Sequence, residues 1–196
     1  DVLKSIKKDF KLSVTTDVHE TSQISKLIEY IDVIQIPAFL SRQTDLIIAA
    51  ADTHKIVNVK KGQFLSHSEV LNIIKKIESR NNKKILITER GNSFGYNYLV
   101  NDFKGIELMK QFGYPIIFDS THSVQIPGGL GVKSGGAREY VLPLSKAASA
   151  LRIAGFFIET HPNPSVALSD GPNMVYLDKM EDLIKSINKI NKAAKE

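Results

Sequence analysis

The chain lacks cysteine and tryptophan, and no run of apolar residues is long enough to cross a bilayer. Without cysteine, disulfide bonds and cysteine-ligated metal centres are excluded within these 196 residues. A transmembrane helix, which needs about 18 consecutive apolar residues, is excluded as well. The first ten residues, DVLKSIKKDF, have a lysine-rich helical pattern that differs from a signal peptide. We therefore expect a cytoplasmic protein, and because the chain begins with Asp1 we expect its natural N-terminus to be missing.

Positive charge exceeds negative charge only slightly, because the chain has 26 Lys+Arg and 21 Asp+Glu and a net charge of +5. The basic residues are not interleaved with aromatic ones, so nucleic acid is not an expected partner. No Gly-x-Gly-x-x-Gly follows a predicted strand and no Walker sequence is present, so no nucleotide cofactor is expected. The composition, 42% hydrophobic and 24% charged, fits a single domain over residues 1–196.

Short β-branched runs alternate with stretches of helical periodicity. The runs cover residues 11–18, 33–36, 56–60, 85–89, 115–119 and 156–160. Apolar runs of this length are typical of parallel strands covered on both faces. The helical stretches lie near 22–30, 43–53, 66–77, 104–112, 140–153 and 179–194, and the third starts with a capping box formed by Ser66 and Glu69. This alternation predicts an α/β fold with a parallel sheet and right-handed crossovers.

Two architectures fit this pattern, an open doubly wound sheet and a barrel. Polar residues lie at or just after the C-terminal end of every predicted strand, namely Asp17, His19, Gln35, Lys60, Glu89, Arg90, Asp119, His122, Glu159 and His161. An open sheet concentrates its ligand groups at one switch point, whereas a barrel gathers them from all its strand ends. The sequence therefore favours a TIM-type (β/α)8 barrel that lacks its two N-terminal strands in this chain.

Two cationic positions are candidates for binding an oxyanion. Lys60 and Lys61 follow an apolar strand, so one of them is expected to point into the barrel mouth and the other outward. Two surface lysines on a loop are the alternative. Arg90 stands between Glu89 and Gly91, where its guanidinium is suited to bidentate binding of an oxyanion. A purely structural pair between Arg90 and Glu89 is the alternative there.

Three further residues after the later strands form a mixed nitrogen and oxygen donor set, His122, Glu159 and Asp170. Such a set suits Zn, Fe or Mn better than Mg or Ca. The same groups are also compatible with a metal-free proton relay in which Glu159 orients His122. His54 and His67 lie in presumed loop or helix-end positions, and no role is assigned to them.

A glycine-rich stretch, PGGLGVKSGG, covers residues 127–136. Five glycines in ten residues do not favour a regular element, so we expect a long loop over the barrel face. The loop is interpreted as a lid, with a simple turn as the alternative.

Seven segments of the chain closely resemble the 3-deoxy-D-manno-octulosonate 8-phosphate synthase family. They are TDVHE (16–20), QIPAFLSRQTDL (35–46), NVKKGQF (58–64), TERGNSFGYNYLV (88–100), IFDSTHSVQ (117–125), SGGAREY (134–140) and ETHPNPSVALSDGPN (159–173). Members of this family are barrels that condense phosphoenolpyruvate with arabinose 5-phosphate and water, releasing phosphate, in lipopolysaccharide biosynthesis. The resemblance implies a transferase with these two small-molecule substrates, and a homotetramer, which is the habit of the family.

The resemblance also implies roles for individual residues. Lys60 and Arg90 match ligands of the phosphoenolpyruvate phosphate, and Ala38 lines the same pocket. The positions near the sugar and the barrel mouth are matched by Asp17, His19, Phe39 and Arg42. Three ligands of a divalent metal in the metal-dependent branch are matched by His122, Glu159 and Asp170. The expected catalytic groups are Asp17, His122, Glu159 and Asp170.

Three alternatives stay open at this point. The metal-dependent and metal-free branches differ by a cysteine or an asparagine on the first strand, which precedes this chain, although Gly62 and the glycine-rich loop favour the metal-dependent branch. A related heptulosonate 7-phosphate synthase would use erythrose 4-phosphate. A non-catalytic barrel that binds sugar phosphates is the third possibility.

Overall fold

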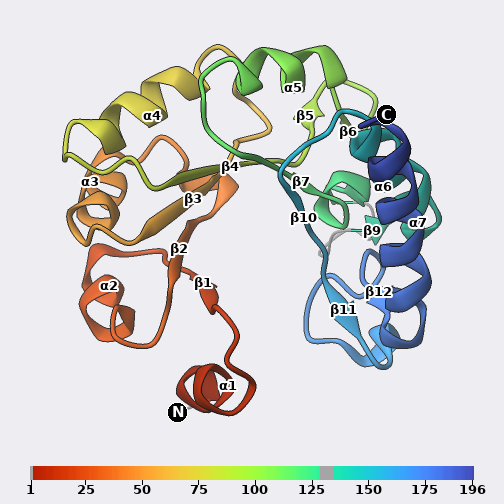
Figure 1. Cartoon of the computed structure of the whole chain (residues 1–196), viewed down its shortest axis with the longest axis horizontal. Helices are drawn as coiled ribbons and strands as arrows, with labels where there is room; N and C mark the ends of the chain where they lie inside the picture. The colour runs from red at the N-terminus through yellow and green to blue at the C-terminus, as the bar shows by residue number, and fades with distance from the viewer. Residues whose placement is uncertain (1, 129–134) are drawn as a thin grey trace.

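The main feature of the computed structural model, which describes residues 2–128 and 135–196, is one curled sheet of six parallel strands (Figure 1). The strands are β1 (Thr15–Asp17), β2 (Val33–Ile36), β3 (Ile56–Lys60), β4 (Ile85–Glu89), β7 (Ile116–Asp119) and β10 (Gly155–Phe157), in that order across the sheet. All neighbours are parallel, so every strand ends at the same edge of the sheet.

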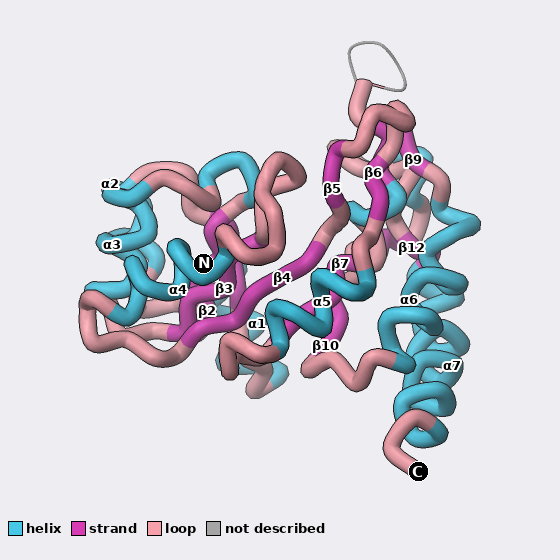
Figure 2. Tube along the Cα trace, turned by 90° about the horizontal axis from the view of Figure 1, so that it is seen from above, coloured by secondary structure: helices cyan, strands magenta, loops and turns pink. Residues whose placement is uncertain are grey.

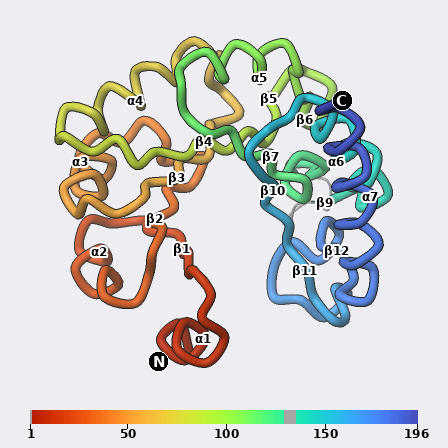
Figure 3. The backbone as a smooth tube through the Cα atoms, in the orientation of Figure 1, coloured from red at the N-terminus to blue at the C-terminus, as the bar shows by residue number. Residues whose placement is uncertain are grey.

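Seven α-helices accompany the strands in the described part of the chain. They are α1 (Val2–Phe10), α2 (Thr21–Leu27), α3 (Thr44–Asp52), α4 (Val70–Glu78), α5 (Phe103–Lys110), α6 (Val141–Ala150) and α7 (Met180–Ala193). Helices α2 to α5 lie along the outer side of the arc, and α6 and α7 lie beside each other near β10 (Figures 1 and 3). This arrangement confirms the predicted α/β barrel-type fold. Of the helices in the described ranges, none is both long and apolar enough to span a membrane.

The hydrophobic core lies between the sheet and the helices. Outward-facing strand residues such as Val57, Val59 and Ile87 are fully buried and belong to one cluster with Ile47 of α3 and Ile74 of α4. Successive side chains of a strand point to opposite faces, so the apolar residues of each strand reach this outer layer at every second position. Burial of each such side chain contributes roughly 1.5–3 kcal/mol to folding.

The inner face of the arc carries polar side chains beside apolar ones, and the polar ones reach into the strands that were expected to be continuous apolar runs. A buried ladder of hydrogen bonds crosses four strands there: Gln35 donates to Asp17, Asn58 Nδ2 donates to Gln35 Oε1 at 2.9 Å, and Thr88 Oγ1 donates to Asn58 Oδ1 at 2.8 Å. Each buried amide finds a partner on the neighbouring strand, which removes the cost of leaving it unpaired.

Several predicted boundaries differ from the structure. The first strand is confined to Thr15–Asp17, and Lys11, which was included in it, has a φ of 52°. The helix expected from Ser66 begins at Val70, because the Glu69 carboxylate accepts both the backbone N–H (2.8 Å) and the hydroxyl (2.9 Å) of Ser66 in the preceding turn. The last strand ends at Phe157, before Glu159.

Short elements complete the fold beyond the predicted ones. Three two-residue pairs are β5 (Asn92–Ser93) with β6 (Leu99–Val100), β8 (Gln125–Ile126) with β9 (Gly135–Gly136), and β11 (Thr160–His161) with β12 (Val175–Tyr176). The 3-10 turns are η1 (Ala38–Leu40), η2 (His122–Val124), η3 (Arg138–Tyr140), η4 (Pro164–Val166) and η5 (Leu177–Lys179). The β5–β6 hairpin extends away from the end of β4 (Figure 2).

The predicted lid over residues 127–136 falls mostly on residues 129–134, which lie outside the described residues. For its last two residues the expectation of an irregular loop is wrong, because Gly135 and Gly136 form β9 and pair antiparallel with β8.

Helix α1 is attached to the sheet by Asp32. The carboxylate of Asp32 accepts from Lys7 Nζ at 2.6 Å and from the backbone N–H of Val14 at 2.9 Å. The hydrogen bond from Lys7, the bond from Val14 and the charge of Lys7 together hold the pKa of Asp32 below its ordinary value.

We predict that Asp32→Ala lowers the free energy of unfolding by about 1 kcal/mol at pH 7, because both bonds are lost and the site is partly exposed. A lowered folded pKa stabilises the protein above the unfolded value, about 3.9, and this contribution disappears as the pH falls through the folded value. The difference between variant and wild type, measured by urea unfolding, therefore shrinks below about pH 4.

The matched control is Asp52→Ala, which removes an exposed pair with Arg80. It is expected to change stability by less than about 0.5 kcal/mol. Equal effects of the two variants would contradict a special role for Asp32.

Candidate active site

A buried carboxylate, Asp119, holds two positively charged or proton-donating groups at the end of β7. Its Oδ2 lies 2.9 Å from Lys60 Nζ and 2.9 Å from His122 Nδ1, and its Oδ1 accepts the backbone N–H of His122 at 2.8 Å. Lys60 ends β3, and its ammonium also lies 3.7 Å from the centre of the Phe157 ring on β10. Three strands of the inner face therefore meet at this carboxylate.

Electrostatics keep Asp119 ionised although it is fully buried. Burial acts to raise the pKa of Asp119, but the hydrogen bond from His122 and the charges of His122 and Lys60 outweigh it and hold the pKa well below its ordinary value. We assign a proton to His122 Nδ1, because that nitrogen faces an ionised acceptor. Nε2 is therefore the ring nitrogen that can offer its lone pair when a metal binds.

The three predicted metal ligands lie together. Ligand atoms of His122, Glu159 and Asp170 are all within 4.8 Å of one another, and His122 Nε2 is 3.6 Å from Glu159 Oε1. Among the residues that the structure describes, Glu159 Oε2 is buried without a hydrogen-bond partner. Burial raises the pKa of Glu159, and the nearby charge of Asp170 adds to this effect. The group therefore fits a divalent cation, which would satisfy the orphaned carboxylate oxygen.

The loop that carries Asp170 is held in place by neighbours. Asp170 has a φ of 53°, in the left-handed region, and its Oδ1 accepts from Gln125 Nε2 at 3.0 Å. The guanidinium of Arg138 donates to the carbonyl oxygens of Gly171 and Met174 in the same loop. These contacts hold the loop so that the Asp170 carboxylate faces His122.

Arg90 is linked to the same group through Gln125. Its Nη2 donates to Gln125 Oε1 at 2.7 Å, so the Gln125 amide bridges Arg90 and Asp170. Burial lowers the pKa of Arg90, against the opposing charge of Asp119. Within residues 2–128 and 135–196, Arg90 Nε is buried and has no hydrogen-bond partner. Arg90 Nε is therefore a charged donor that its neighbours among the described residues leave unsatisfied.

The structure corrects two interpretations of the neighbouring charges. The alternative in which Arg90 pairs with Glu89 is wrong, because the Glu89 carboxylate lies beside Lys61 Nζ at 3.4 Å and His67 Nε2 at 3.3 Å. Lys61 does point away from Lys60, but it is fully buried and not on the surface. His67, which received no role, is buried there too. The sequence does contain a signal for this arrangement. Lys61 is the second lysine after an apolar strand, and if such a lysine is buried it needs an acidic partner.

The remaining predicted residues follow β1 and β2 at the same edge of the sheet. Asp17 accepts from Gln35, and Ala38 is buried at the start of η1. Three are exposed, namely His19, Phe39 and Arg42. His161 lies in β11, where its Nδ1 accepts the N–H of Asn163 at 3.0 Å, and it is not part of the His122 group.

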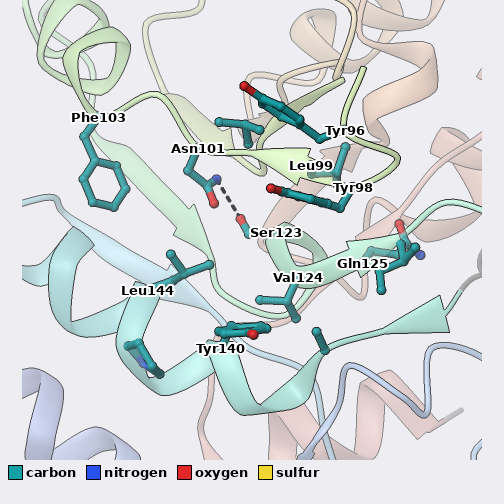
Figure 4. A pocket seen from close by; sticks show the side chains of 14 residues that line it. Tyr96, Tyr98, Leu99, Asn101, Phe103, Ser123, Val124, Gln125, Tyr140 and Leu144 are labelled. Carbon is teal, nitrogen blue, oxygen red and sulfur yellow. Dashed lines mark hydrogen bonds between the residues drawn. The ribbon is translucent and has the colours of Figure 1, made fainter. Parts of the chain in front are cut away.

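A separate cavity of about 820 Å³ lies beside this site (Figure 4). The residues that line it include Tyr96, Tyr98, Tyr140 and Leu144. Two other lining residues are joined by a hydrogen bond from Asn101 Nδ2 to Ser123 Oγ (3.0 Å). Gln125 is shared between its lining and the network of Arg90 and Asp170. The cavity is mainly apolar, and the ionisable groups gather at the strand ends instead.

Comparison with known proteins gives a consistent result. A sequence model of the DAHP synthetase I family matches residues 1–196. A 2-dehydro-3-deoxyphosphooctonate aldolase of Fusobacterium nucleatum is 51% identical over 194 residues, which cover 99% of this chain and 70% of the relative. Proteins with the same name from Rhodopseudomonas palustris and Bradyrhizobium diazoefficiens are 54% and 52% identical, and the matches cover 100% and 99% of this chain and 68% and 69% of theirs.

We predict that Asp119→Ala lowers the free energy of unfolding by about 3–5 kcal/mol, because it leaves Lys60 largely buried without its anionic partner. The measurement is equilibrium unfolding in urea. Adding Lys60→Met to the variant removes the unpaired charge and is expected to recover much of the loss. A single variant as stable as the wild type would contradict the network.

Proposed function

The chain belongs to the DAHP synthetase I family, and on this premise we propose that it is a 3-deoxy-8-phosphooctulonate synthase. The proposed reaction condenses phosphoenolpyruvate with D-arabinose 5-phosphate and water to give 3-deoxy-D-manno-octulosonate 8-phosphate and inorganic phosphate. The observation that carries this proposal is the meeting of Lys60 and Arg90 with the His122 group at one edge of the sheet. The shared name of the relatives at about half identity supports the same product.

Lys60 and Arg90 are proposed to bind the phosphate of phosphoenolpyruvate. The unpartnered Nε of Arg90 and the ammonium of Lys60 are charged donors, and donors of this kind make the shorter and stronger hydrogen bonds to phosphate oxygens. The ladder that runs from Thr88 to Asp17 is fully paired, so it does not compete for them. Fixed cations of this kind orient the enol for attack, which contributes several kcal/mol by positioning alone.

The bond changes follow from the substrates. C3 of phosphoenolpyruvate attacks the aldehyde carbon, so positive charge develops at C2 and negative charge on the aldehyde oxygen, which then takes a proton. Water adds to C2 and gives up a proton. The resulting hemiketal phosphate then loses phosphate as its C–O bond breaks, and the proton of the C2 hydroxyl passes to the departing phosphate, which leaves a ketone at C2. The site offers cations and anions fixed in advance for both charges. Asp17 is proposed to lie near the aldehyde. Asp170, whose carboxylate has two oxygens, is the candidate acceptor of the water proton when a metal is bound, and His122 takes this role only in the metal-free relay.

A divalent metal of the Zn, Fe or Mn type is part of the proposal, held by His122, Glu159 and Asp170. When bound, it would supply Lewis acidity toward an aldehyde or a water molecule. The chain's own contribution is to orient these ligands. Asp119 holds His122 through Nδ1, and Gln125 holds Asp170 through Oδ1.

Further parts of the proposal rest on family likeness. His19, Phe39 and Arg42 are proposed to line the mouth for the sugar phosphate, and Ala38 the pocket of phosphoenolpyruvate. We also propose a cytoplasmic homotetramer that serves lipopolysaccharide biosynthesis.

The experiment that tests the function measures phosphate release from phosphoenolpyruvate by the intact protein. Release is expected with arabinose 5-phosphate and not with erythrose 4-phosphate. A preference for erythrose 4-phosphate would instead establish the heptulosonate reaction. Binding of both substrates without release would support a non-catalytic barrel.

The metal is tested by its content in the purified protein. We predict that His122→Ala lowers the bound Zn, Fe or Mn, measured by mass spectrometry, at least tenfold, because a ligand is lost. The matched control is His161→Ala, which removes a histidine outside the group and keeps the metal. Wild-type protein that is free of metal and active in chelator would favour the metal-free relay.

A further inference from the structure

A second set of buried charges lies on the outer face of the same strands, where the proposed reaction does not use it. Lys61 and Glu89 are both fully buried, with Lys61 Nζ 3.4 Å from Glu89 Oε2. His67 Nε2 approaches the same carboxylate oxygen at 3.3 Å, and His67 Nδ1 lies 3.7 Å from Asp102 Oδ2 at the start of α5. An acid between two basic side chains is thus enclosed among apolar neighbours.

Lys61 joins the two loops that follow β3 and β4. Its Nζ donates to the carbonyl oxygens of Gly62 and Leu65, both at 3.4 Å, in the loop after β3. It also donates to the side chain of Asn92 at the start of β5, in the segment after β4. One buried ammonium therefore fixes the spacing of the two loops.

Glu89 fixes the turn directly after Arg90. Its Oε1 accepts the backbone N–H of Gly91 at 2.5 Å, and Gly91 has a φ of 92°, which favours glycine. The side chain of Glu89 thus connects the two residues that flank Arg90, Glu89 itself and Gly91. This contact limits the directions in which the Arg90 side chain leaves the strand.

Helix α5 is shaped to admit His67. A Cβ added to Gly105 would lie 2.2 Å from His67 Nδ1, so only glycine leaves room for the imidazole at that position. Because α5 leaves space for the imidazole in a mainly apolar layer, we infer that the packing of this layer places His67 beside Glu89.

Alternation along the strands connects this set to the proposed site. Lys60 faces inward and Lys61 outward at the end of β3, and Glu89 and Arg90 differ in the same way at the end of β4. The backbone N–H of Lys61 also donates to Thr88 O at 2.8 Å, which ties the two strand ends together. A shift of the Lys61–Glu89 pair would therefore move the backbone from which the side chains of Lys60 and Arg90 extend.

We propose that Lys61 and Glu89, supported by His67, are positioning residues that set the separation and direction of Lys60 and Arg90. The inference rests on the proposed function, since those two cations are assigned to the phosphate of phosphoenolpyruvate. A buried ion pair is a weak source of stability compared with apolar residues of similar volume. Geometry, more than stability, is therefore the effect that this pair has on the site.

The test measures the Kd of phosphoenolpyruvate by titration calorimetry and the midpoint of urea unfolding on the same samples. Glu89→Gln keeps an acceptor for Gly91 but removes the charge beside Lys61. The double variant Lys61→Met, Glu89→Leu replaces the pair with apolar groups, which restores stability in comparable buried pairs. Both are expected to weaken phosphoenolpyruvate binding at least tenfold, which is about the loss seen when the hydrogen-bond partners that orient metal ligands are mutated.

The two kinds of role are separated by the double variant. If the pair only stabilises the fold, a double variant with wild-type unfolding behaviour also binds with the wild-type Kd, and the proposal is overturned. A positioning role predicts weak binding despite normal stability, together with a raised KM for phosphoenolpyruvate and a kcat changed less than the KM. The KM for arabinose 5-phosphate is expected to stay within twofold of the wild type.

The matched control is Lys55→Met. Lys55 precedes β3 at the opposite end, where its Nζ donates to the carbonyl oxygen of Ile31 at 2.9 Å. This variant also removes a lysine that bonds to backbone, but it is expected to leave the Kd unchanged. A wild type that binds phosphoenolpyruvate but releases no phosphate would contradict the proposed function alone. An unchanged Kd in the folded Glu89 variant would contradict the positioning role alone.

Discussion

The contact on which the site depends is the buried carboxylate of Asp119 between Lys60 and His122. A carboxylate in this position is tolerable only if cations or donors reach it, because an unpaired buried charge is strongly unfavourable. The requirement fixes where β3 must end, how the His122 ring is turned and which nitrogen carries its proton. From that ring the remaining geometry follows, since Nε2 faces Glu159 and Asp170.

Parallel strands make this arrangement possible because they deliver their ends to one edge and alternate their side chains between two faces. The inner face carries the polar ladder and the two cations proposed to bind phosphate, Lys60 and Arg90, and the outer face carries the apolar core. Lys61 and Glu89 break this division, and they do so one residue away from Lys60 and Arg90. Two ion pairs on opposite faces of the sheet thereby hold the end of β3, the inner one to Asp119 at the end of β7 and the outer one to Glu89 at the end of β4.

The long apolar strands could be predicted well from the sequence. The ranges 33–36, 56–60 and 85–89 agree with β2, β3 and β4, because a dense β-branched run between polar turns has few alternatives. The two-residue pairs were missed, since their partners are distant in sequence and each segment is too short to carry a pattern. The strand predicted over 156–160 ends at Phe157 because of a tertiary contact, in which the Thr121 hydroxyl accepts the N–H of Glu159 at 3.1 Å.

The site could be predicted in part. The residue types at the strand ends and the family resemblance pointed to His122, Glu159 and Asp170, which lie together in the structure. The pairing of Glu89 could not be obtained from spacing, because sequence neighbours on a strand point to opposite faces. The burial of Lys61 and the role of His67 depend on partners supplied by other strands and by α5. The bridge that Gln125 makes between Arg90 and Asp170 was missed for the same reason.

The most direct test of this account is a crystal structure of the protein with phosphoenolpyruvate bound. We expect phosphate oxygens within hydrogen-bond distance, about 3 Å, of Lys60 Nζ and Arg90 Nε. We also expect Lys61 and Glu89 to stay paired on the other face of the sheet. A phosphate group bound elsewhere, with Arg90 Nε still unpartnered, would contradict this account.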